Sequence, residues 1–391
     1  MAGGGSGGHV TPVLAILEAL AKQQQDLEIV FVCDKKFAPQ AQTILARSSL
    51  AITLKTVQAG KLRRYHGVPL WKQLLDIPTV LLNIRDSFLI GVGILQSRRL
   101  LKKFKPQVVF GKGGFVCMPV GIAAKQLRIP LVIHDSDAHP GLTNRVLAKW
   151  ATLIATGSPL ENYNYPKDRS YYTGIPVGAQ FRPATPGQQQ EFKQSLMSDP
   201  TRKLVVVVGG GLGAKPINDA MVAIAPKMMD ERAEVIMVTG VAHGDVVAQQ
   251  VAKALSGEEQ KYYHIEPFID AEKMAQVLKA ADVVVSRGGA TAIAELALLG
   301  KATVLVPSPR LTGGQQLKNA KGLEQAGAVV LVDDTKLRQN STILEQALLW
   351  VLKNKATQTT LQERMHTFAK PEAAAEVAKL ILQAAGQGRG K

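Results

Sequence analysis

The chain has 391 residues, of which 46% are hydrophobic, enough for two domains with sizeable buried cores. Its 47 Lys and Arg residues outnumber 31 Asp and Glu residues. The resulting net charge of +16 indicates an anionic partner, which is a membrane surface, a nucleic acid or a phosphorylated substrate. Two cysteines, Cys33 and Cys117, exclude a disulfide framework and indicate a reducing cytosol. The first residues lack a signal-peptide pattern, and the absence of an unbroken run of about 18 apolar residues predicts no spanning helix.

The stretch from Met1 to Pro12 is rich in glycine and runs directly into an apolar-periodic segment. This composition is typical of a loop that binds an anionic or hydroxyl-rich ligand at a helix start. His9 lies at the corner, where its imidazole could act on the ligand, but a tight turn with a solvent-facing histidine is equally compatible. Such loops follow a β-strand, and only Met1 and Ala2 remain before the glycines. We therefore expect the central strand of the first domain to be missing or stunted, through a downstream start site or trimming.

Strands and helices alternate through the first half, which is typical of a parallel sheet. Expected strands cover residues 27–33, 51–57, 107–110, 131–134 and 153–156. Loops at residues 3–9, 111–114 and 134–144 are expected to open at one edge of this sheet, where ligands of such folds bind. The residues from Asn162 to Phe181, rich in Tyr and Pro, are predicted to form a linker.

The segment Lys61–Lys105 combines 10 basic residues with only 2 acidic ones and with many apolar side chains around Trp71. A helix or loop of this composition fits a membrane interface, with its cations on anionic headgroups. An ordinary amphipathic core helix and a solvated basic face remain open alternatives.

The α/β pattern restarts at Lys203. Expected strands cover residues 203–208, 234–240, 264–269, 281–286, 303–307 and 328–332, with glycine loops at 209–214 and 286–290. The Ala-rich end of the chain is predicted to be helical and to pack back on the first domain. The sequence thus predicts an α/β fold of two Rossmann-like domains, with parallel sheets, facing a cleft. The expected divisions are residues 1–163, residues 164–368 and a C-terminal helix within 369–391.

A donor site is expected in the second half. The segment Gly288–Thr291 at a helix start would present N–H groups and the positive end of the helix dipole to a diphosphate. Glu295 shares the helical face of Thr291 one turn on, so its carboxylate could accept hydrogen bonds from a ribose diol, although an ordinary surface glutamate has the same spacing. Gln315 and Gln316 could bind sugar hydroxyls.

Seven motifs, in the same order over nearly the whole chain, resemble those of the bacterial MurG family of N-acetylglucosaminyltransferases. They are Gly4–Pro12, Gly111–Val116, His134 with Gly141–Asn144, Phe268-Ile269, Arg287–Glu295, Gln315-Gln316 and Asn319-Ala320. The resemblance implies a GT-B fold, UDP-N-acetylglucosamine as donor and an undecaprenyl-diphosphate-linked muramyl-pentapeptide (lipid I) as acceptor. It also implies peripheral attachment to the cytoplasmic face of the cell membrane, peptidoglycan synthesis as the role, and no nucleic-acid partner.

The resemblance also assigns individual residues. Donor-binding residues would be Ser6, Gly7, Gly8, Asp137, Gly211, Phe268, Ile269, Ala290, Thr291, Ala292, Ile293, Ala294, Glu295, Gln315 and Gln316. Acceptor-side residues would be Gly113, Gly114, His134 and Asn144. For an inverting displacement, His9 is the first candidate for the base that deprotonates the acceptor hydroxyl, and Asp137 is the second. No cofactor or metal ion is expected, although Asp135-Ser136-Asp137 superficially matches a metal-binding pair of aspartates.

Three segments depart from the family pattern. The family's His-Glu-Gln-Asn is here His134–Asp137, its Ser-Gln after the second-domain glycines is Gly211-Leu212, and its Asn-Pro-Val-Arg is Ile175–Gly178. These changes remove an amide, a hydroxyl and a cation from the expected donor site, and Lys215 could replace the missing charge.

Competing interpretations remain. Another UDP-sugar enzyme of the same fold, such as a glycolipid synthase or a sugar-nucleotide epimerase, would carry the same donor residues. A dinucleotide oxidoreductase is disfavoured because Asp34 is only a loose match for its ribose-binding acid. A nucleic-acid binder is disfavoured because the basic segment lacks interleaved stacking aromatics.

Overall fold

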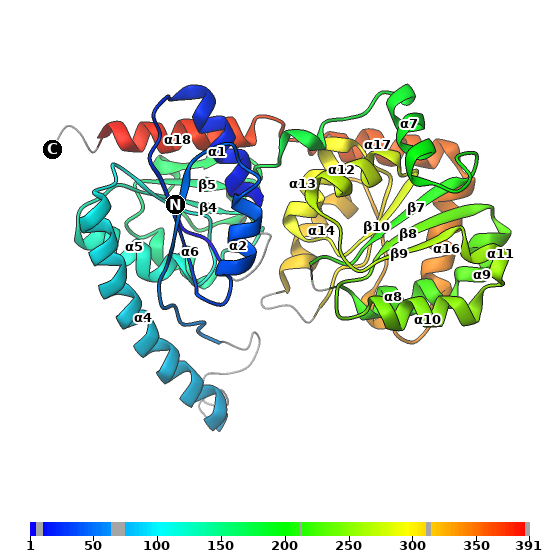
Figure 1. The fold of residues 1–391 in the computed structure, drawn as a ribbon, viewed down its shortest axis with the longest axis horizontal. Coiled ribbons are helices and arrows are strands. Elements are labelled where there is room, and N and C mark those ends of the chain that lie inside the picture. Colours follow the sequence, from blue (N-terminus) through cyan, green and yellow to red (C-terminus); the bar gives the residue numbers. More distant parts are fainter. Residues whose placement is uncertain (5–10, 64–74, 212, 310–313, 388–391) are drawn as a thin grey trace. The chain divides into compact units, whose positions relative to one another are not determined.

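The computed structural model describes residues 1–391 except 5–10, 64–74, 212, 310–313 and 388–391 (Figure 1). The chain divides into two units, one formed by Met1–Gly178 with Lys370–Lys391 and the other by Ala179–Ala369. The first unit therefore extends beyond the expected boundary at residue 163. The prediction of a linker over 162–181 is wrong, because β6 (Ser170–Tyr172) in this region pairs in parallel with β5 (Leu153–Thr156).

The first unit is a parallel sheet covered by helices. Its elements are α1 (Thr11–Gln23), β1 (Ile29–Cys33), α2 (Ala38–Leu45), β2 (Ile52–Thr56), α4 (Ile77–Phe104), β3 (Val109–Gly111), α5 (Cys117–Gln126), β4 (Leu131–Asp135), α6 (Leu142–Leu147), β5, the 3-10 helices η2 (Leu160–Asn162) and η3 (Lys167–Arg169), β6 and α18 (Ala373–Gln387). The expected strands of the first half are confirmed within a few residues. Strand order is β1-β2 in one part of the sheet and β3-β4-β5-β6 in the other.

The two parts of this sheet are joined by the first three residues. Ala2 makes parallel bridges to Val32 of β1 and to Gly111 of β3. Its N–H donates to the carbonyl of Phe110 at 2.7 Å, and the N–H of Gly3 donates to the carbonyl of Val32 at 3.1 Å. The prediction of a stunted central strand is confirmed: these few residues occupy the position between β1 and β3.

Two apolar clusters bury the faces of the sheet in the first unit. One contains Phe31, Phe110 and residues of α1 and α18, including Ile16 and Ile381. The other contains residues of β3 and β4 with residues of α5 and α6, including Ile133 and Leu147. The helix α18 comes from the far end of the chain and packs against α1 (Figure 1). Burial of its apolar stripe, at roughly 25 cal/mol per Å², is the force that holds the C-terminus to this unit.

The second unit has a sheet of six parallel strands in the order β12-β11-β10-β7-β8-β9. Its elements are η4 (Ala179–Phe181), α7 (Pro186–Leu196), β7 (Lys203–Val208), α8 (Lys215–Ala223), α9 (Ala225–Asp230), β8 (Ala233–Val238), α10 (Gly244–Ala254), α11 (Gly257–Gln260), β9 (Tyr263–Glu266), α12 (Ala271–Ala280), β10 (Val283–Ser286), α13 (Ala290–Leu299), β11 (Thr303–Leu305), α14 (Gln315–Gln325), β12 (Val330–Leu331), α15 (Asp334–Leu337), α16 (Thr342–Lys353) and α17 (Lys355–His366). The valine-rich strands β7 and β10 lie at its centre and are nearly fully buried, which explains their continuous apolar runs.

Candidate functional site

Two loops of the first unit meet at the carboxyl ends of β3 and β4. Gly113 has a φ of 98°, a conformation that glycine adopts without strain, and a side chain there would lie 3.4 Å from Nδ2 of Asn144. Asn144 Nδ2 in turn donates to the carbonyl of His134 at 3.1 Å. The structure therefore brings together the acceptor-side residues Gly113, His134 and Asn144, with Gly114 next in the chain.

His134 is fully buried, and its Nε2 donates to the carbonyl of Gly174 at 2.9 Å. Burial lowers the pKa of His134 well below its ordinary value, with the Lys112 charge as a second cause. The imidazole is therefore neutral, and its Nδ1 is free to accept the hydrogen bond that the Ser136 hydroxyl donates at 3.4 Å. These contacts make His134 a residue that fixes the loop rather than a proton carrier.

Lys112, a buried cation beside this loop, was not among the residues expected at the site. Its ammonium donates a hydrogen bond to the hydroxyl of Ser136. Burial lowers the pKa of Lys112 to about 8, while the charges of Asp137 and Asp135 act in the opposite direction. A charged residue directly after a buried strand was the available signal. Residues 135–137, where the chain departs from the family pattern, therefore lie beside the ammonium group of Lys112.

Asp135 and Asp137 have different surroundings. Asp135 is buried and accepts a 2.7 Å hydrogen bond from the Tyr165 hydroxyl, and burial raises its pKa to about 7. Asp137 is partly exposed, and its backbone carbonyl accepts a 2.8 Å hydrogen bond from the Tyr163 hydroxyl. The rings of Tyr163 and Tyr165 stack with their centroids 5.3 Å apart, and their hydroxyl groups hold this loop in place through the two hydrogen bonds.

In the second unit, the expected diphosphate site lies at the start of α13. Gly288 has a φ of 74°, and Gly289 is the N-cap residue with extended backbone. The first turn, from Ala290 through Ala292 to Ile293 and Ala294, carries no acidic residue, and the N–H groups at a helix start have no intrahelical acceptor. This turn can donate to an anion.

Glu295 lies on α13 one turn after Thr291 and is partly buried. Burial raises the pKa of Glu295 to about 8. Within the described part of the chain, its carboxyl group forms no hydrogen bond or ion pair. An unpaired, partly buried carboxyl group at a helix start can accept hydrogen bonds from ligand hydroxyls.

The other donor residues lie at ends of strands and helices in the same unit. Phe268 is 60% exposed and Ile269 is buried, and both stand between β9 and α12. Gln315 and Gln316 form the first turn of α14, and Gln316 Oε1 accepts a 2.8 Å hydrogen bond from the Ser308 N–H. The amide nitrogen of Gln316 is then the group that can donate to a sugar hydroxyl.

Arg287, part of a quoted motif, has a structural role in this unit. Its guanidinium donates to Asp334 Oδ1 at 2.5 Å and to the carbonyl of Val306 at 3.1 Å. Lys215, suggested as a replacement cation, forms a 2.7 Å ion pair with Asp219 on the same helix. Gly211 is exposed in the loop after β7.

Ser6, Gly7, Gly8 and His9 lie outside the described residues, and so does Leu212. Among the residues that are described, no three His, Cys, Asp or Glu side chains are grouped to hold a metal ion. Absence of a metal requirement stays a prediction.

Comparison with known proteins tests the family. The model of the glycosyltransferase family 28 N-terminal domain matches residues 1–156, and that of the C-terminal domain matches residues 204–381. A UDP-N-acetylglucosamine–N-acetylmuramyl-(pentapeptide) pyrophosphoryl-undecaprenol N-acetylglucosamine transferase of Halalkalibacterium halodurans is 33% identical over 337 residues, which is 86% of each chain.

Solved structures agree with this result. The crystal structure of Acinetobacter baumannii MurG matches with a TM-score of 0.68 at 25% identity and covers 98% of both chains. A UDP-N-acetylglucosamine 2-epimerase matches with a TM-score of 0.69 over 99% of this chain and 96% of its own, but at 13% identity it shows the fold alone. The fold is thus the two-domain α/β architecture of GT-B enzymes, and the chain belongs to glycosyltransferase family 28, within its MurG group.

Proposed function

We propose that this protein transfers N-acetylglucosamine from UDP-N-acetylglucosamine to the 4-hydroxyl of lipid I, forming lipid II for peptidoglycan synthesis. The observation that carries the proposal is the similarity, over 86% of each chain, to a transferase named for this reaction. It is joined by Glu295 on α13, whose carboxyl group has no partner among the described residues. The transfer is an inverting single displacement.

The donor residues of the second unit support this reaction. The first turn of α13 would donate hydrogen bonds to the diphosphate, and Glu295 would accept them from the ribose diol. The backbone of Ile269 would pair with the uracil, and the exposed Phe268 ring would support it. Gln316, with Gln315, would bind the hydroxyls of N-acetylglucosamine. Gly211, which stands where the family has Ser, would offer open space but no hydroxyl group beside the diphosphate.

The reaction requires a base on the acceptor side. The O4–H bond of the muramyl residue loses its proton to the base, O4 bonds to the anomeric carbon, and the bond from that carbon to UDP breaks. The helix-start N–H groups would stabilise the charge on the leaving UDP. His9 is the first candidate base and Asp137 the second. His134 is excluded as the base by its burial and by its hydrogen bond to Gly174. No metal ion takes part in this scheme.

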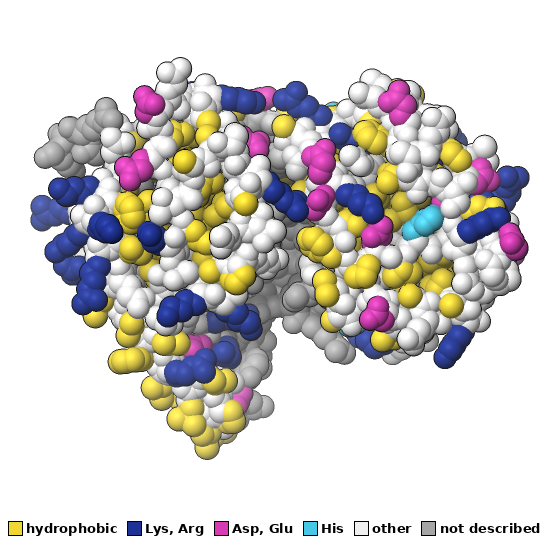
Figure 2. All heavy atoms as spheres, in the orientation of Figure 1, with side chains coloured by type: hydrophobic (Ala, Val, Ile, Leu, Met, Phe, Trp, Pro, Cys, Tyr) yellow, Lys and Arg dark blue, Asp and Glu magenta, His cyan; other side chains and the backbone are white. Residues whose placement is uncertain are grey.

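The helix α4 is the proposed contact with the membrane. The buried side chains of α4 lie on one narrow stripe of the helix. On this side Gly93 packs against segment 57–60, so closely that an added Cβ would lie 2.0 Å from the Gln58 carbonyl oxygen. The opposite side is apolar and exposed, formed by Ile77, Leu81, Ile84, Phe88 and Leu95. Figure 2 shows hydrophobic side chains gathered on the projecting end of α4, with Lys and Arg side chains nearby.

By length and composition alone, α4 is long and apolar enough to cross a membrane, and only 17% of its most apolar window is buried. The expectation of no spanning helix considered only unbroken apolar runs and did not include such a helix. However, Asp86 lies on its buried side, bonded to Arg63 at 2.7 Å and Arg85 at 3.0 Å. An ion pair at mid-helix and an apolar stripe on one side favour a helix that lies on an anionic membrane surface. We propose that α4 attaches the protein peripherally to the membrane, on the cytoplasmic face that the similarity to MurG implies.

The function is tested by incubating the purified protein with radiolabelled UDP-N-acetylglucosamine, with and without lipid I in detergent. We expect label in the lipid fraction only when lipid I is present. Lipid-independent conversion of the donor to its 2-epimer would instead support the epimerase alternative, and label on a different lipid would support a glycolipid synthase. His9→Ala and Asp137→Asn variants then identify the base: a loss in kcat of about a hundredfold or more, within the range typical of general bases, marks the residue.

A further inference from the structure

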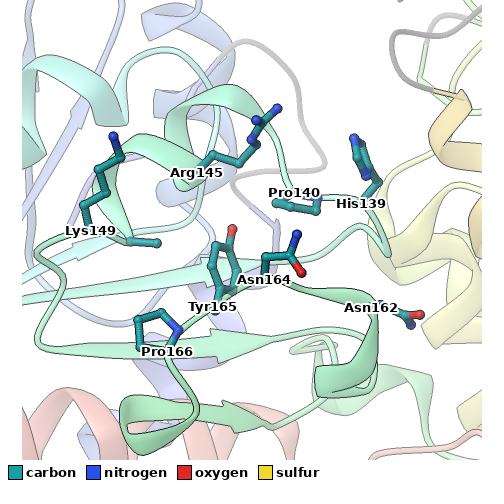
Figure 3. A pocket seen from close by; sticks show the side chains of 9 residues that line it. His139, Pro140, Arg145, Lys149, Asn162, Asn164, Tyr165 and Pro166 are labelled. Carbon is teal, nitrogen blue, oxygen red and sulfur yellow. The ribbon is translucent and has the colours of Figure 1, made fainter.

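The first unit contains a cavity of about 490 Å³ between the loop before α6 and the segment after η2 (Figure 3). This volume suits a small ligand or a few peptide residues. The lining residues that matter here are His139, Arg145, Lys149, Asn162, Asn164 and Tyr165.

The lining is basic and rich in hydrogen-bonding groups. Arg145 lies on α6 and Lys149 in the turn that follows this helix; both are exposed, and neither forms an ion pair within the described residues. The described residues that line the cavity include no Asp or Glu, while Asn162 and Asn164 supply amides that can both donate and accept hydrogen bonds. Two uncompensated cations beside two amides fit a ligand that carries a carboxylate and peptide bonds.

The wall of this cavity is continuous with the acceptor-side loop. Tyr165 lines the cavity and donates to Asp135 at the end of β4, at 2.7 Å. His139 belongs to the loop that runs from Asp137 to α6, and Asn144 on α6 anchors that loop to β4. A molecule whose reacting hydroxyl lies at Asp137 would therefore have its neighbouring substituents close to the cavity.

We propose that the cavity binds the stem peptide of the acceptor and that Arg145 and Lys149 pair with a peptide carboxylate. This inference rests on the proposed function. In a muramyl residue the peptide is carried on the oxygen next to the 4-hydroxyl, so the peptide leaves the sugar beside the reacting atom. Its terminal carboxylate matches the two cations, and its amide groups match the two asparagines. The cavity thus acts as a specificity site for the acceptor and takes no part in the chemical step.

The test compares acceptors and variants in the transfer assay. The acceptors are short-chain lipid I with a free peptide carboxylate, the same compound with that carboxylate amidated, and a lipid-diphosphate muramyl acceptor without peptide. The variant is Arg145→Gln/Lys149→Gln, and the control is Lys167→Gln, which removes an exposed cation of η3 outside the cavity lining. Unchanged thermal unfolding verifies that both variants are folded.

We expect the double variant to raise KM for the carboxylate acceptor at least tenfold, with kcat and the KM for UDP-N-acetylglucosamine unchanged. On the amidated and the peptide-free acceptors, the variant and the wild-type protein should differ by less than twofold, and the control should match the wild type throughout. An equal rise in KM on the peptide-free acceptor would assign the cations to the diphosphate and overturn the proposal. Normal KM in the double variant would overturn it as well.

The two proposals can fail separately. If the wild-type protein transfers sugar to lipid I but the double variant is normal, only the peptide site is refuted. If the wild-type protein transfers sugar to none of the acceptors, the proposed function fails and the peptide site fails with it. Direct calorimetric titration with the free pentapeptide gives a second readout: the wild type should bind it, and the double variant should bind at least tenfold more weakly.

Discussion

The hydroxyl of Tyr165 donates a 2.7 Å hydrogen bond to Oδ2 of Asp135, which ties the segment after η2 to the end of β4. Tyr165 lines the basic cavity, and Asp135 stands two residues before Asp137, the second candidate for the catalytic base. One hydrogen bond thus connects the proposed peptide site to the acceptor-side loop. It also places a carboxyl group in a buried position, with consequences for stability.

The first prediction concerns Asp135 and pH. Its pKa is about 7 in the folded protein and about 3.9 in an unfolded chain, so the folded state binds more protons between these values. The free energy of unfolding contributed by this group therefore falls as pH rises from 4 to 7. Asp135→Asn should remove that fall and stabilise the protein at pH 8 by up to roughly 4 kcal/mol, since each pKa unit is about 1.4 kcal/mol. Urea unfolding at pH 5 and pH 8 measures the free energy of unfolding, and the exposed Asp168→Asn serves as the control. If the free energy of unfolding of Asp135→Asn falls with pH as much as that of the wild type, the prediction is wrong.

The second prediction concerns Glu295 and donor binding. A carboxylate accepts hydrogen bonds from a ribose diol, and the pKa of about 8 keeps Glu295 largely protonated at pH 6. The affinity for UDP-N-acetylglucosamine should increase up to tenfold per unit from pH 6 to about 8 and then level off. The intact nucleotide sugar is the suitable probe because the terminal phosphate of UDP itself titrates near pH 6. Glu295→Gln should bind weakly and without this pH dependence, whereas Glu324→Gln on the surface should behave as the wild type; a Glu295→Gln profile that still rises with pH refutes the role.

The third prediction separates structure from binding at Arg287. Among the described residues, Arg287→Met leaves the buried Asp334 with the 2.9 Å pair to Arg338 as its one ion pair, and an incompletely paired buried charge is costly. The free energy of unfolding should drop by about 2–4 kcal/mol, while the KM for the donor in the remaining folded protein changes less than threefold. Arg338→Met removes the more exposed partner of Asp334 and should lower the free energy of unfolding by less than Arg287→Met does. A large change in donor KM without loss of stability would make Arg287 a ligand-binding residue.

Much of this architecture could be predicted from the sequence, because apolar runs and glycine loops are local signals. The six strands of the second unit and the glycine-to-helix start at α13 follow from such runs. The structural role of Arg287 could not be predicted, because its partner Asp334 lies 47 residues away in the sequence. The end of the first unit was also missed, because β6 has three residues, Ser-Tyr-Tyr, between turns and gives no hydrophobic periodicity. The position of Lys112 directly after a buried strand is visible in the sequence, but its burial depends on tertiary packing, which the local sequence does not determine.

The fourth prediction tests α4 as a membrane contact. Leu81→Ser/Phe88→Ser removes two side chains that are each more than 60% exposed and therefore contribute little to folding. Binding to phosphatidylglycerol vesicles should fall at least tenfold, because each side chain contributes on the order of 1 kcal/mol or more on insertion. Val246→Ser on the second unit is the matched control and should bind normally. Sedimentation with vesicles measures the binding of each variant. Alkaline carbonate should release the wild-type protein from membranes, and retention of the protein in the membrane fraction would indicate that α4 spans the membrane.

The fifth prediction is that the reaction needs no divalent metal ion. The scheme stabilises the leaving UDP with backbone N–H groups of α13 and assigns no step to a cation. Transfer rates in EDTA and in added Mg²⁺ or Mn²⁺ should agree within twofold. A loss of activity in EDTA that Mg²⁺ or Mn²⁺ restores would contradict this and would direct attention to Asp135 and Asp137.

Transfer to the 4-hydroxyl of the muramyl residue is the central claim, and it can be measured on the product itself. Lipid I and its 4-deoxy analogue are incubated with UDP-N-acetylglucosamine and the purified protein, and the products are analysed by mass spectrometry and NMR. The account predicts one N-acetylglucosamine residue added to lipid I, attached at O4 with inverted anomeric configuration, and nothing added to the 4-deoxy analogue. An unmodified lipid I, or sugar on the 4-deoxy analogue, would contradict it.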